Sequence, residues 1–366
     1  MCSSMANLEF SVPYNNDPET LTEVFKLKLQ KGNRIREVYL SGPQQYSGSG
    51  RITEEMNEAE FIGIMKRIHE EGLRVNLLMN TTCEGLEWYN PEVVKTKIDF
   101  LRRMYEEHGL EAVTLANPLY VAEVRRHFPD LEICASVLGE IDCLERAEIF
   151  ARLGANVITP DVDINRNLPL LRKMKKAIKG EFKLMVNDGC LYKCPFRRFH
   201  FNYISHRSKE VAPIEGDAFF ANCSQVTLWD YSQIFKSGWI RPEDLEGYTD
   251  ITPFFKIVGR ARPRSMVLRT VDAYMKQRWD GDLLDILSGS LNKLGLEYGA
   301  HLENKCLTDY GFFARITSCG YDCLDCDYCQ DLAAKLMRFR VITRGKLEDL
   351  QLKEAADELE RMGKLP

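Results

Sequence analysis

Short apolar segments alternate with longer amphipathic segments along the first 260 residues of the chain. A short apolar run that ends in small or polar residues is typical of a buried strand, and apolar positions at helical spacing are typical of a helix packed on a sheet. Strands are predicted at Glu9–Tyr14, Glu37–Leu40, Arg74–Met79, Ala112–Ala116, Glu132–Val137, Asn156–Thr159, Lys183–Val186 and, less clearly, Gln225–Leu228. Helices are predicted between them at Glu58–Gly72, Pro91–His108, Leu119–His127, Asp142–Leu153 and Asn167–Ile178.

Eight strand–helix units with short connections favour an α/β fold, a TIM-type (β/α) barrel over residues 1–262. The chain has no glycine-rich dinucleotide-binding turn, which weighs against the structural alternative, a doubly wound open sheet. Residues 263–366 follow a different pattern, in which a loop-rich segment at 301–330 collects cysteines. Helices are predicted there at Arg264–Gln277, Asp282–Leu294, Asp331–Arg340 and Lys346–Met362. We therefore expect a C-terminal helical region with a cysteine-rich, metal-binding loop.

The chain carries 49 Lys and Arg against 54 Asp and Glu, a net charge of -5. This balance argues against generic nucleic-acid binding, although an RNA substrate stays open because a local basic patch would suffice for it. No run of 18 apolar residues occurs, and the first nine residues lack the apolar core of a signal peptide. We expect a cytoplasmic protein with no membrane partner.

Four cysteines near the C-terminus have the spacing Cys319-x3-Cys323-x2-Cys326-x2-Cys329. Without a secretory signal, such close spacing favours metal ligation over disulfides. The x2 spacing predicts a 4Fe-4S cluster, with zinc as the alternative at Cys319–Cys329. The first three cysteines also have the C-x3-C-x2-C spacing of radical SAM enzymes, although in those enzymes it follows the first strand of the barrel. A radical SAM-like enzyme is therefore a further alternative.

A second group of cysteines, Cys190, Cys194 and Cys223, follows the predicted strand Lys183–Val186. Thiolates at a strand's carboxyl end would open into the barrel mouth and select zinc or an iron–sulfur cluster. The alternative is that these are buried free thiols. Cys306, which stands apart from the compact group, is predicted as the fourth ligand, with a non-protein ligand as the other option.

Polar residues with few charges end most of the predicted strands, which indicates a pocket for a small polar substrate. The alternative is that such residues only end strands and begin turns. The predicted pocket residues are Asn15, Asn80, Asn117, Thr159, Asp161, Asn187 and Asp188.

Three stretches resemble the collagenase-like peptidase family U32: ARLGANVITPDVDINRNLPLLRKMKK, the Asn-Asp-Gly-Cys segment that ends at Cys190, and FKIVGRARPRSMVLRTVDAY. The resemblance implies a cluster-binding TIM-like barrel, with Cys190, Cys194 and Cys223 as ligands. It also implies that Lys256, Gly259 and Arg260 form the family's Lys-Ile-x-Gly-Arg strand. Better understood members assist oxygen-independent hydroxylation of ubiquinone precursors or of a tRNA or ribosomal RNA base, some with prephenate as oxygen donor.

This sequence departs from the family pattern in several places. Cys190 and Cys194 are closer together than the usual pair, Val258 replaces a glutamate, and the Cys306–Cys329 segment lies outside the pattern. The transfer of one particular reaction is therefore not implied.

The leading hypothesis is a 4Fe-4S-dependent enzyme, carrying one cluster or two, that modifies a small molecule or nucleobase by oxygen-independent redox or hydroxylation-type chemistry. Asp161, Asn187, Asp188 and Arg260 are the predicted catalytic residues, and Lys256 or Arg260 is expected to hold a substrate carboxylate. In the alternative, Arg260 pairs with an internal carboxylate such as Asp161 and only ties the barrel closed. A peptidase, as the family name suggests, is the second hypothesis, although no Ser-His-Asp spacing, His-Glu-x-x-His motif or evident Cys–His pair occurs. A non-catalytic electron-transfer or scaffold subunit, with a redox partner or paired subunit, is the third.

Overall fold

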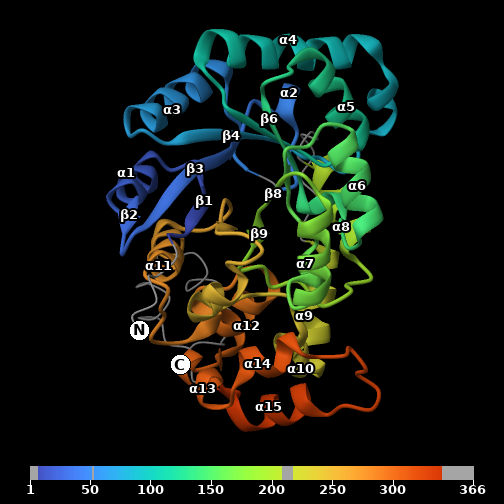
Figure 1. The fold of residues 1–366 in the computed structure, drawn as a ribbon. Helices are drawn as coiled ribbons and strands as arrows, with labels where there is room; N and C mark the ends of the chain where they lie inside the picture. Colours follow the sequence, from blue (N-terminus) through green and yellow to red (C-terminus); the bar gives the residue numbers. More distant parts are fainter. Residues whose placement is uncertain (1–6, 52, 208–216, 340–366) are drawn as a thin grey trace.

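The computed structural model describes residues 7–51, 53–207 and 217–339. Parallel strands form a barrel, and neighbouring strands pair with each other except for β8 and β9, which follow one another in the same stave (Figure 1). In spatial order they are β1 (Glu9–Pro13), β3 (Asn33–Ser41), β4 (Arg74–Met79), β5 (Ala112–Leu115), β6 (Glu132–Ala135), β7 (Val157–Ile158), β8 (Glu181–Phe182), β9 (Leu184–Met185) and β10 (Phe254–Lys256). The short β2 (Leu29–Gln30) runs antiparallel to β3.

Strands β8 and β9 are two halves of one stave that are separated only by Lys183. The first half pairs with β7 and the second with β10, and β10 pairs in turn with β1. The circuit of parallel pairings therefore returns to its start, which confirms the predicted TIM-type barrel. The predicted strand Gln225–Leu228 is wrong, because those residues lie within helix α9 and the last stave is β10.

Helices on the outer surface of the barrel follow the strands, with bounds close to the predicted ones (Figure 1). They are α1 (Pro18–Lys26), α2 (Gln44–Ser47), α3 (Glu58–Glu70), α4 (Pro91–His108), α5 (Pro118–His127), α6 (Leu144–Arg152), α7 (Leu168–Ala177) and α11 (Arg264–Met275). Many of their first turns are capped by Asn or Asp side chains, among them Asn117, whose Oδ1 accepts a hydrogen bond from the Leu119 amide. This capping explains part of the polar character of the strand ends.

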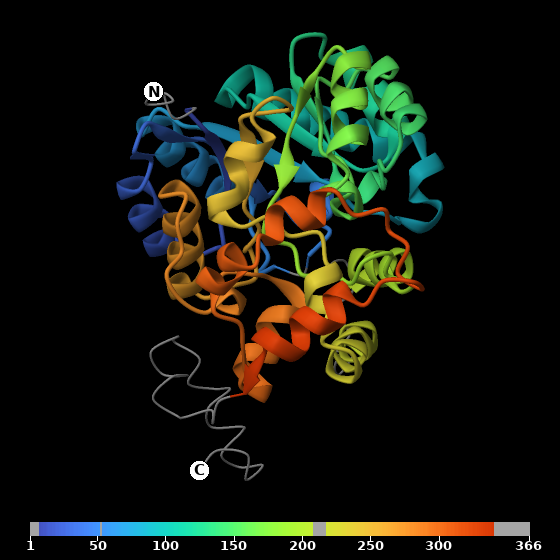
Figure 2. The same ribbon diagram turned by 60° about the horizontal axis from the view of Figure 1, so that its bottom comes forward.

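The remaining helices gather at the carboxyl ends of the strands, as the lower part of Figure 1 and the rotated view in Figure 2 show. They are α8 (Arg197–Arg207), α9 (Ala218–Trp229), α10 (Ser232–Lys236), α12 (Gly289–Tyr298), α13 (Asn304–Asp309), α14 (Phe312–Thr317) and α15 (Tyr328–Leu336), with β11 (Ala300–His301) antiparallel to β12 (Arg338–Phe339). The predicted helix Asp331–Arg340 therefore begins earlier and gives way to a strand. The predicted helix Lys346–Met362 and Cys2 lie outside the described residues.

A buried ion pair occupies the interior of the barrel. The Lys183 ammonium lies 2.7 Å from Oε1 of Glu37, and both side chains are 1% exposed or less. Ser11 and Asn76 also donate hydrogen bonds to that carboxylate. Burial alone would raise the pKa of Glu37, but the Lys183 charge and these hydrogen bonds outweigh it and lower the pKa to about 2. The Lys183 ammonium and the Glu37 carboxylate therefore stabilise each other in their charged forms.

None of the helices among the described residues combines the length and apolar character that crossing a membrane requires.

We predict that Lys183→Met lowers the free energy of unfolding by about 3–5 kcal/mol, because it leaves the Glu37 carboxylate buried and unpaired. The double variant Lys183→Met/Glu37→Gln should regain most of this loss. Urea denaturation measures both, with Lys26→Met in the exposed Lys26–Glu23 pair as the control that costs less than about 1 kcal/mol. A double variant as unstable as the sum of its single variants would contradict the pairing.

Candidate active site at the barrel mouth

A cavity of about 360 Å³ lies at the carboxyl ends of the strands, and we call it the mouth cavity. Its floor is made by strand ends and its walls by α8, α9 and the start of α12. This volume falls in the range of small-molecule sites. The cavity contains predicted site residues from several strands: Asn80, Asp188, Cys190, Cys194, Cys223, Lys256, Gly259 and Arg260.

The segment that leads into the cavity from β9 is held by close backbone packing. A Cβ atom on Gly189 would lie 2.1 Å from the Ser288 carbonyl oxygen, so only glycine fits there. The Ser290 hydroxyl donates to the Gly189 carbonyl at 3.1 Å. The Asn187 side chain donates to the Val258 carbonyl and accepts from the Val258 amide. The Asn-Asp-Gly-Cys segment therefore fixes where Cys190 enters the cavity.

Four cationic side chains face the mouth cavity without an acidic partner among the described residues: Arg51, Lys256, Arg260 and Arg262. Arg260 donates through Nη1 to the hydroxyls of Ser41 and Ser49, and not to Asp161. The alternative in which Arg260 pairs with Asp161 is therefore wrong. A cavity with an excess of buried positive charge favours an anionic ligand.

Burial lowers the pKa of three of these cations. Burial first, and then repulsion from Lys183 and Arg260, lower the pKa of Lys256 to about 7. The pKa values of Arg260 and Arg262 are both lowered to about 10, mainly by burial, with the Arg51 charge adding to it. Each of these groups would be stabilised in its charged form by an anion in the cavity.

The predicted carboxylates differ in their environment. Asp161 forms a buried ion pair with Arg197 at 2.8 Å and does not line the cavity. Asp188 lines the cavity, and its Oδ2 is buried without a hydrogen-bond partner among the described residues. Of the predicted catalytic residues, Asp188 and Arg260 thus face the cavity, while Asn187 and Asp161 hold the surrounding structure.

Three thiols line the mouth cavity: Cys190 and Cys194 in the loop after β9, and Cys223 on α9. Burial raises the pKa of all three thiols. At Cys223, burial and then the Cys194 thiol raise the pKa to about 11. Cys306 lies on α13 against the hydrophobic core and is not among the described residues that line the cavity.

The C-terminal cysteines lie in the loop between α14 and α15 and in the first turn of α15. Burial raises the pKa of Cys329 to about 11, and the thiols of Cys319 and Cys323 act in the same direction. Within the described ranges, no three histidine, cysteine or acidic side chains already have the arrangement of a metal site. Metal binding by either group of cysteines therefore stays a prediction.

The structure brings the two segments that carry these cysteines into contact. Tyr192, between Cys190 and Cys194, stacks on Tyr321, which follows Cys319 by two residues. The ring centroids are 5.4 Å apart, and the rings are inclined by 19°. This contact could not be predicted from the sequence, in which the two tyrosines are far apart.

The sequence also gave no indication of a Cys–His contact. Nε2 of His206, at the end of α8, lies 3.2 Å from Sγ of Cys83, which follows β4. Neither residue lines the mouth cavity. A spacing of more than a hundred residues between two unremarkable positions carries no local signal.

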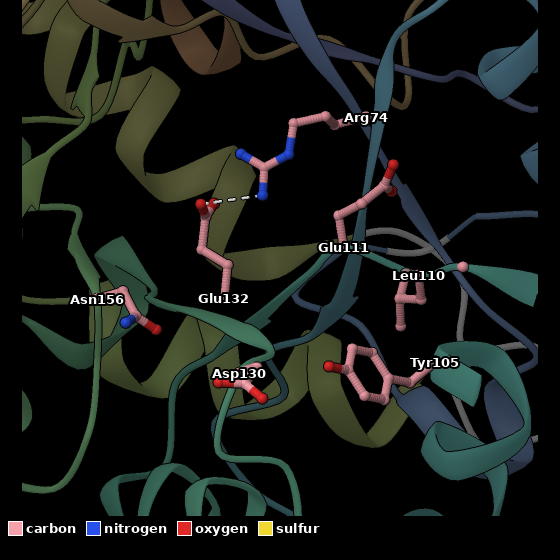
Figure 3. Close-up of a pocket in the computed structure, with 8 residues that line it drawn as sticks. Arg74, Tyr105, Leu110, Glu111, Asp130, Glu132 and Asn156 are labelled. Atoms are coloured by element: carbon pink, nitrogen blue, oxygen red, sulfur yellow. Dashed lines mark hydrogen bonds and ion pairs between the residues drawn. The ribbon is translucent and has the colours of Figure 1, made fainter.

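A second cavity, of about 470 Å³, lies at the opposite end of the barrel, near the amino ends of β4 to β7 (Figure 3). Arg74 and Glu132, which line it, form an ion pair at 3.0 Å. Barrel enzymes carry their chemistry at the other end, where the mouth cavity lies. The mouth cavity is therefore the candidate active site.

The fold and this site define an α/β-barrel protein with cationic residues and thiols at the barrel mouth. The model of peptidase family U32 matches residues 22–211, more than half of the chain, so the chain belongs to that family. The uncharacterized protease MJ1657 of Methanocaldococcus jannaschii is 29% identical over 343 residues, which cover 90% of this chain and 99% of that protein.

Among solved structures, the U32 peptidase Mk0906 has a TM-score of 0.52 at 21% identity, covering 71% of this chain and 95% of that chain. At this identity the likeness shows a shared fold alone. The resemblance that the Asn-Asp-Gly-Cys and Lys-Ile-x-Gly-Arg segments indicated is confirmed at the level of the family.

The lowered pKa of Lys256 predicts a pH dependence of stability. Between pH 7 and the ordinary lysine value of 10.5, the unfolded chain holds a proton that the folded chain has lost, so stability rises with pH in this window. Relative to Lys256→Met, the wild-type chain should gain about 2–3 kcal/mol between pH 7 and pH 9, by urea denaturation. The exposed-site variant Lys276→Met serves as the control. If the difference in free energy of unfolding between wild type and Lys256→Met stays constant with pH, the lowered pKa of Lys256 is contradicted.

Proposed function

We propose that this protein is an iron–sulfur-dependent enzyme whose mouth cavity binds a small carboxylate-bearing substrate for oxygen-independent redox or hydroxylation-type modification. The observation that carries the proposal is the set of four cations that have no acidic partner among the described residues, on the wall of a cavity that also holds three thiols. Buried positive charge is costly unless an anion accompanies it. A substrate carboxylate would supply that anion.

Arg260 is placed to hold the carboxylate. Its two hydrogen bonds to serine hydroxyls both use Nη1. Among the described residues no group accepts a hydrogen bond from the other guanidinium nitrogens, so these can bind a ligand. A guanidinium binds a carboxylate through two parallel hydrogen bonds, which fixes orientation as well as position. The serine contacts hold the arginine still before the ligand arrives.

Lys256 and Asp188 are the candidates for proton transfer. A lysine with a pKa of about 7 exists in both forms near neutral pH and takes up a proton when an anion binds beside it. The unpartnered Oδ2 of Asp188 can accept a hydrogen bond or a proton from a substrate hydroxyl. Both groups line the same cavity, so they can act on one bound molecule.

The thiols of Cys190, Cys194 and Cys223 fit a 4Fe-4S cluster in kind and in position, since soft sulfur ligands from two sides meet at one cavity. A cluster bound there would supply one-electron transfer or a Lewis-acidic iron next to the substrate. The placement of Cys306 on α13 favours a non-protein fourth ligand over the predicted cysteine.

Thiol-dependent peptide hydrolysis is a second candidate function, favoured by the family name and by the 3.2 Å contact between Cys83 and His206. This pair lies apart from the mouth cavity, so the two functions have separate tests.

The first test concerns the substrate. With anaerobically purified protein, small mono- and dicarboxylates should perturb the visible circular dichroism of the cluster. Arg260→Ala should abolish that response while retaining the iron, because the carboxylate loses its guanidinium partner. Arg278→Ala, which removes an exposed arginine paired with Asp280, is the matched control. No response in the wild-type protein would count against a catalytic mouth cavity.

The second test separates the peptidase. If Cys83 were the nucleophile, Cys83→Ala would abolish the hydrolysis of an unstructured peptide such as reduced casein, and Cys143→Ala would not. We expect no cleavage that depends on Cys83, measured by release of peptide amines. A loss of cleavage confined to Cys83→Ala and His206→Ala would replace the proposed function with peptide hydrolysis.

A further inference from the structure

The four cysteines of the C-terminal loop, Cys319, Cys323, Cys326 and Cys329, stand within eleven residues, and we call them the cysteine block. The block lies outside residues 22–211, which the family model matches, and takes no part in the proposed function of the mouth cavity. Several donors around it lack partners, and these donors indicate what the block binds.

Arg166 is the first of these donors. Its side chain is buried, its Nη atoms donate to the carbonyls of Phe235 and Trp239, and its Nε has no hydrogen-bond partner among the described residues. The guanidinium carbon lies 4.8 Å from the Trp239 ring and 5.2 Å from the Phe312 ring. No acidic side chain of the described residues pairs with it. A buried cation kept without a counter-charge is costly, so the site favours an anion.

Two tyrosine hydroxyls beside the block, those of Tyr321 and Tyr328, are also buried and have no hydrogen-bond partner in the part of the chain that the structure describes. The Tyr321 amide donates to Sγ of Cys319 at 3.3 Å, and Tyr328 directly precedes Cys329, so both tyrosines belong to the loop that carries the block. A buried hydroxyl without a hydrogen bond destabilises the folded chain, because it has lost its contact with water. A centre rich in acceptors, bound at the cysteine block, would satisfy these unpaired donors.

Arg315 completes the positive surroundings. Its Nη2 donates to Sγ of Cys326 at 3.3 Å, and its guanidinium carbon lies 4.8 Å from the Tyr328 ring. No ion pair joins Arg315 to an acidic residue within the described ranges. Arg166 and Arg315 therefore add positive charge near the cysteine block, and neither forms an ion pair with the aspartates of the loop that the structure describes.

We propose that the cysteine block binds a second iron–sulfur centre, a 4Fe-4S cluster held by four thiolates, whose negative charge is balanced by Arg166 and Arg315 and whose sulfur atoms accept hydrogen bonds from Tyr321 and Tyr328. Thiolates select iron–sulfur clusters or zinc. The single run of closely spaced cysteines matches cluster-binding loops, whereas structural zinc sites usually draw on two separated pairs. Hydrogen bonds to the sulfur atoms are a common means of setting a cluster's potential.

The centre would lie beside the mouth cavity. The Tyr192–Tyr321 stack joins the loop of Cys190 and Cys194 to the cysteine block, at 5.4 Å between ring centroids. Two clusters at this location would be close enough for their unpaired spins to interact. The second centre thus goes beyond the proposed function, and it can be present whether or not the mouth cavity holds a cluster.

The test uses the full chain, reconstituted anaerobically with ferrous iron and sulfide, with iron, sulfide and zinc counted per chain. We expect about eight iron atoms in the wild type and about four in each of two variants, Cys323→Ser/Cys326→Ser and Cys190→Ser/Cys194→Ser. Cys143→Ser, at a half-buried cysteine outside both groups, should keep all of the iron. Circular dichroism in the far ultraviolet confirms that each variant is folded.

The outcomes separate the two proposals. Full iron retention in Cys323→Ser/Cys326→Ser, or a zinc atom lost from that variant in place of iron, overturns the second iron–sulfur centre. Full retention in Cys190→Ser/Cys194→Ser overturns the mouth cluster and leaves the second centre standing. In the reduced wild type, paramagnetic resonance should show spin–spin broadening that disappears in both variants, and its absence would overturn the proposed proximity.

The surrounding donors are tested in the Cys190→Ser/Cys194→Ser background, where one cluster remains. Tyr328→Phe and Arg166→Met should move the midpoint potential of that cluster to more negative values, because each removes a group that stabilises the reduced, more negative form. Arg166→Lys, which keeps the charge, should restore part of the shift. Since Arg166→Met also removes contacts to carbonyls, Tyr328→Phe decides alone if that variant fails to fold. Unchanged potentials would overturn the role of these donors.

Discussion

The buried ion pair between Lys183 and Glu37 is the interaction on which the barrel and its site both depend. Lys183 stands at the junction of β8 and β9, the stave that pairs with β7 through one half and with β10 through the other. Its side chain is therefore directed into the interior where the barrel closes. Because a buried charge is stable there only with its partner, the pairing with Glu37 ties the closing stave to β3 across the barrel.

The same charge reaches the mouth cavity. Lys256 is on β10, next to the closing stave, and repulsion from Lys183 adds to burial in lowering its pKa to about 7. A residue that stabilises the fold thus also sets the protonation of a group at the site. Because Glu37 is already paired with Lys183, its carboxylate does not neutralise the cations of the mouth cavity, and the cavity keeps its positive charge.

The C-terminal region contributes more than a cover for the barrel. It presses Ser288 and Ser290 against Gly189, which places the first thiol of the cavity. It also brings Tyr321 onto Tyr192, so that two cysteine-bearing segments from distant parts of the chain are in contact. Family membership rests on residues 22–211, and the C-terminal loop that carries the cysteine block lies outside that match.

The sequence by itself determined the barrel, because buried strands and amphipathic helices leave local patterns, and α4 and β4 have the predicted bounds. It also determined which segments carry thiols, since close cysteine spacing is a local signal. It failed at Gln225–Leu228, where an apolar run is helical, because a short apolar run does not distinguish strand from helix. Tertiary structure alone decided the roles of single polar residues. Asp161 is neutralised by Arg197, and the Asn187 side chain hydrogen-bonds to the Val258 backbone. Asp188 lines the cavity with an unpaired carboxylate oxygen among the described residues. Such roles depend on which partners meet in space, and spacing along the chain does not record them.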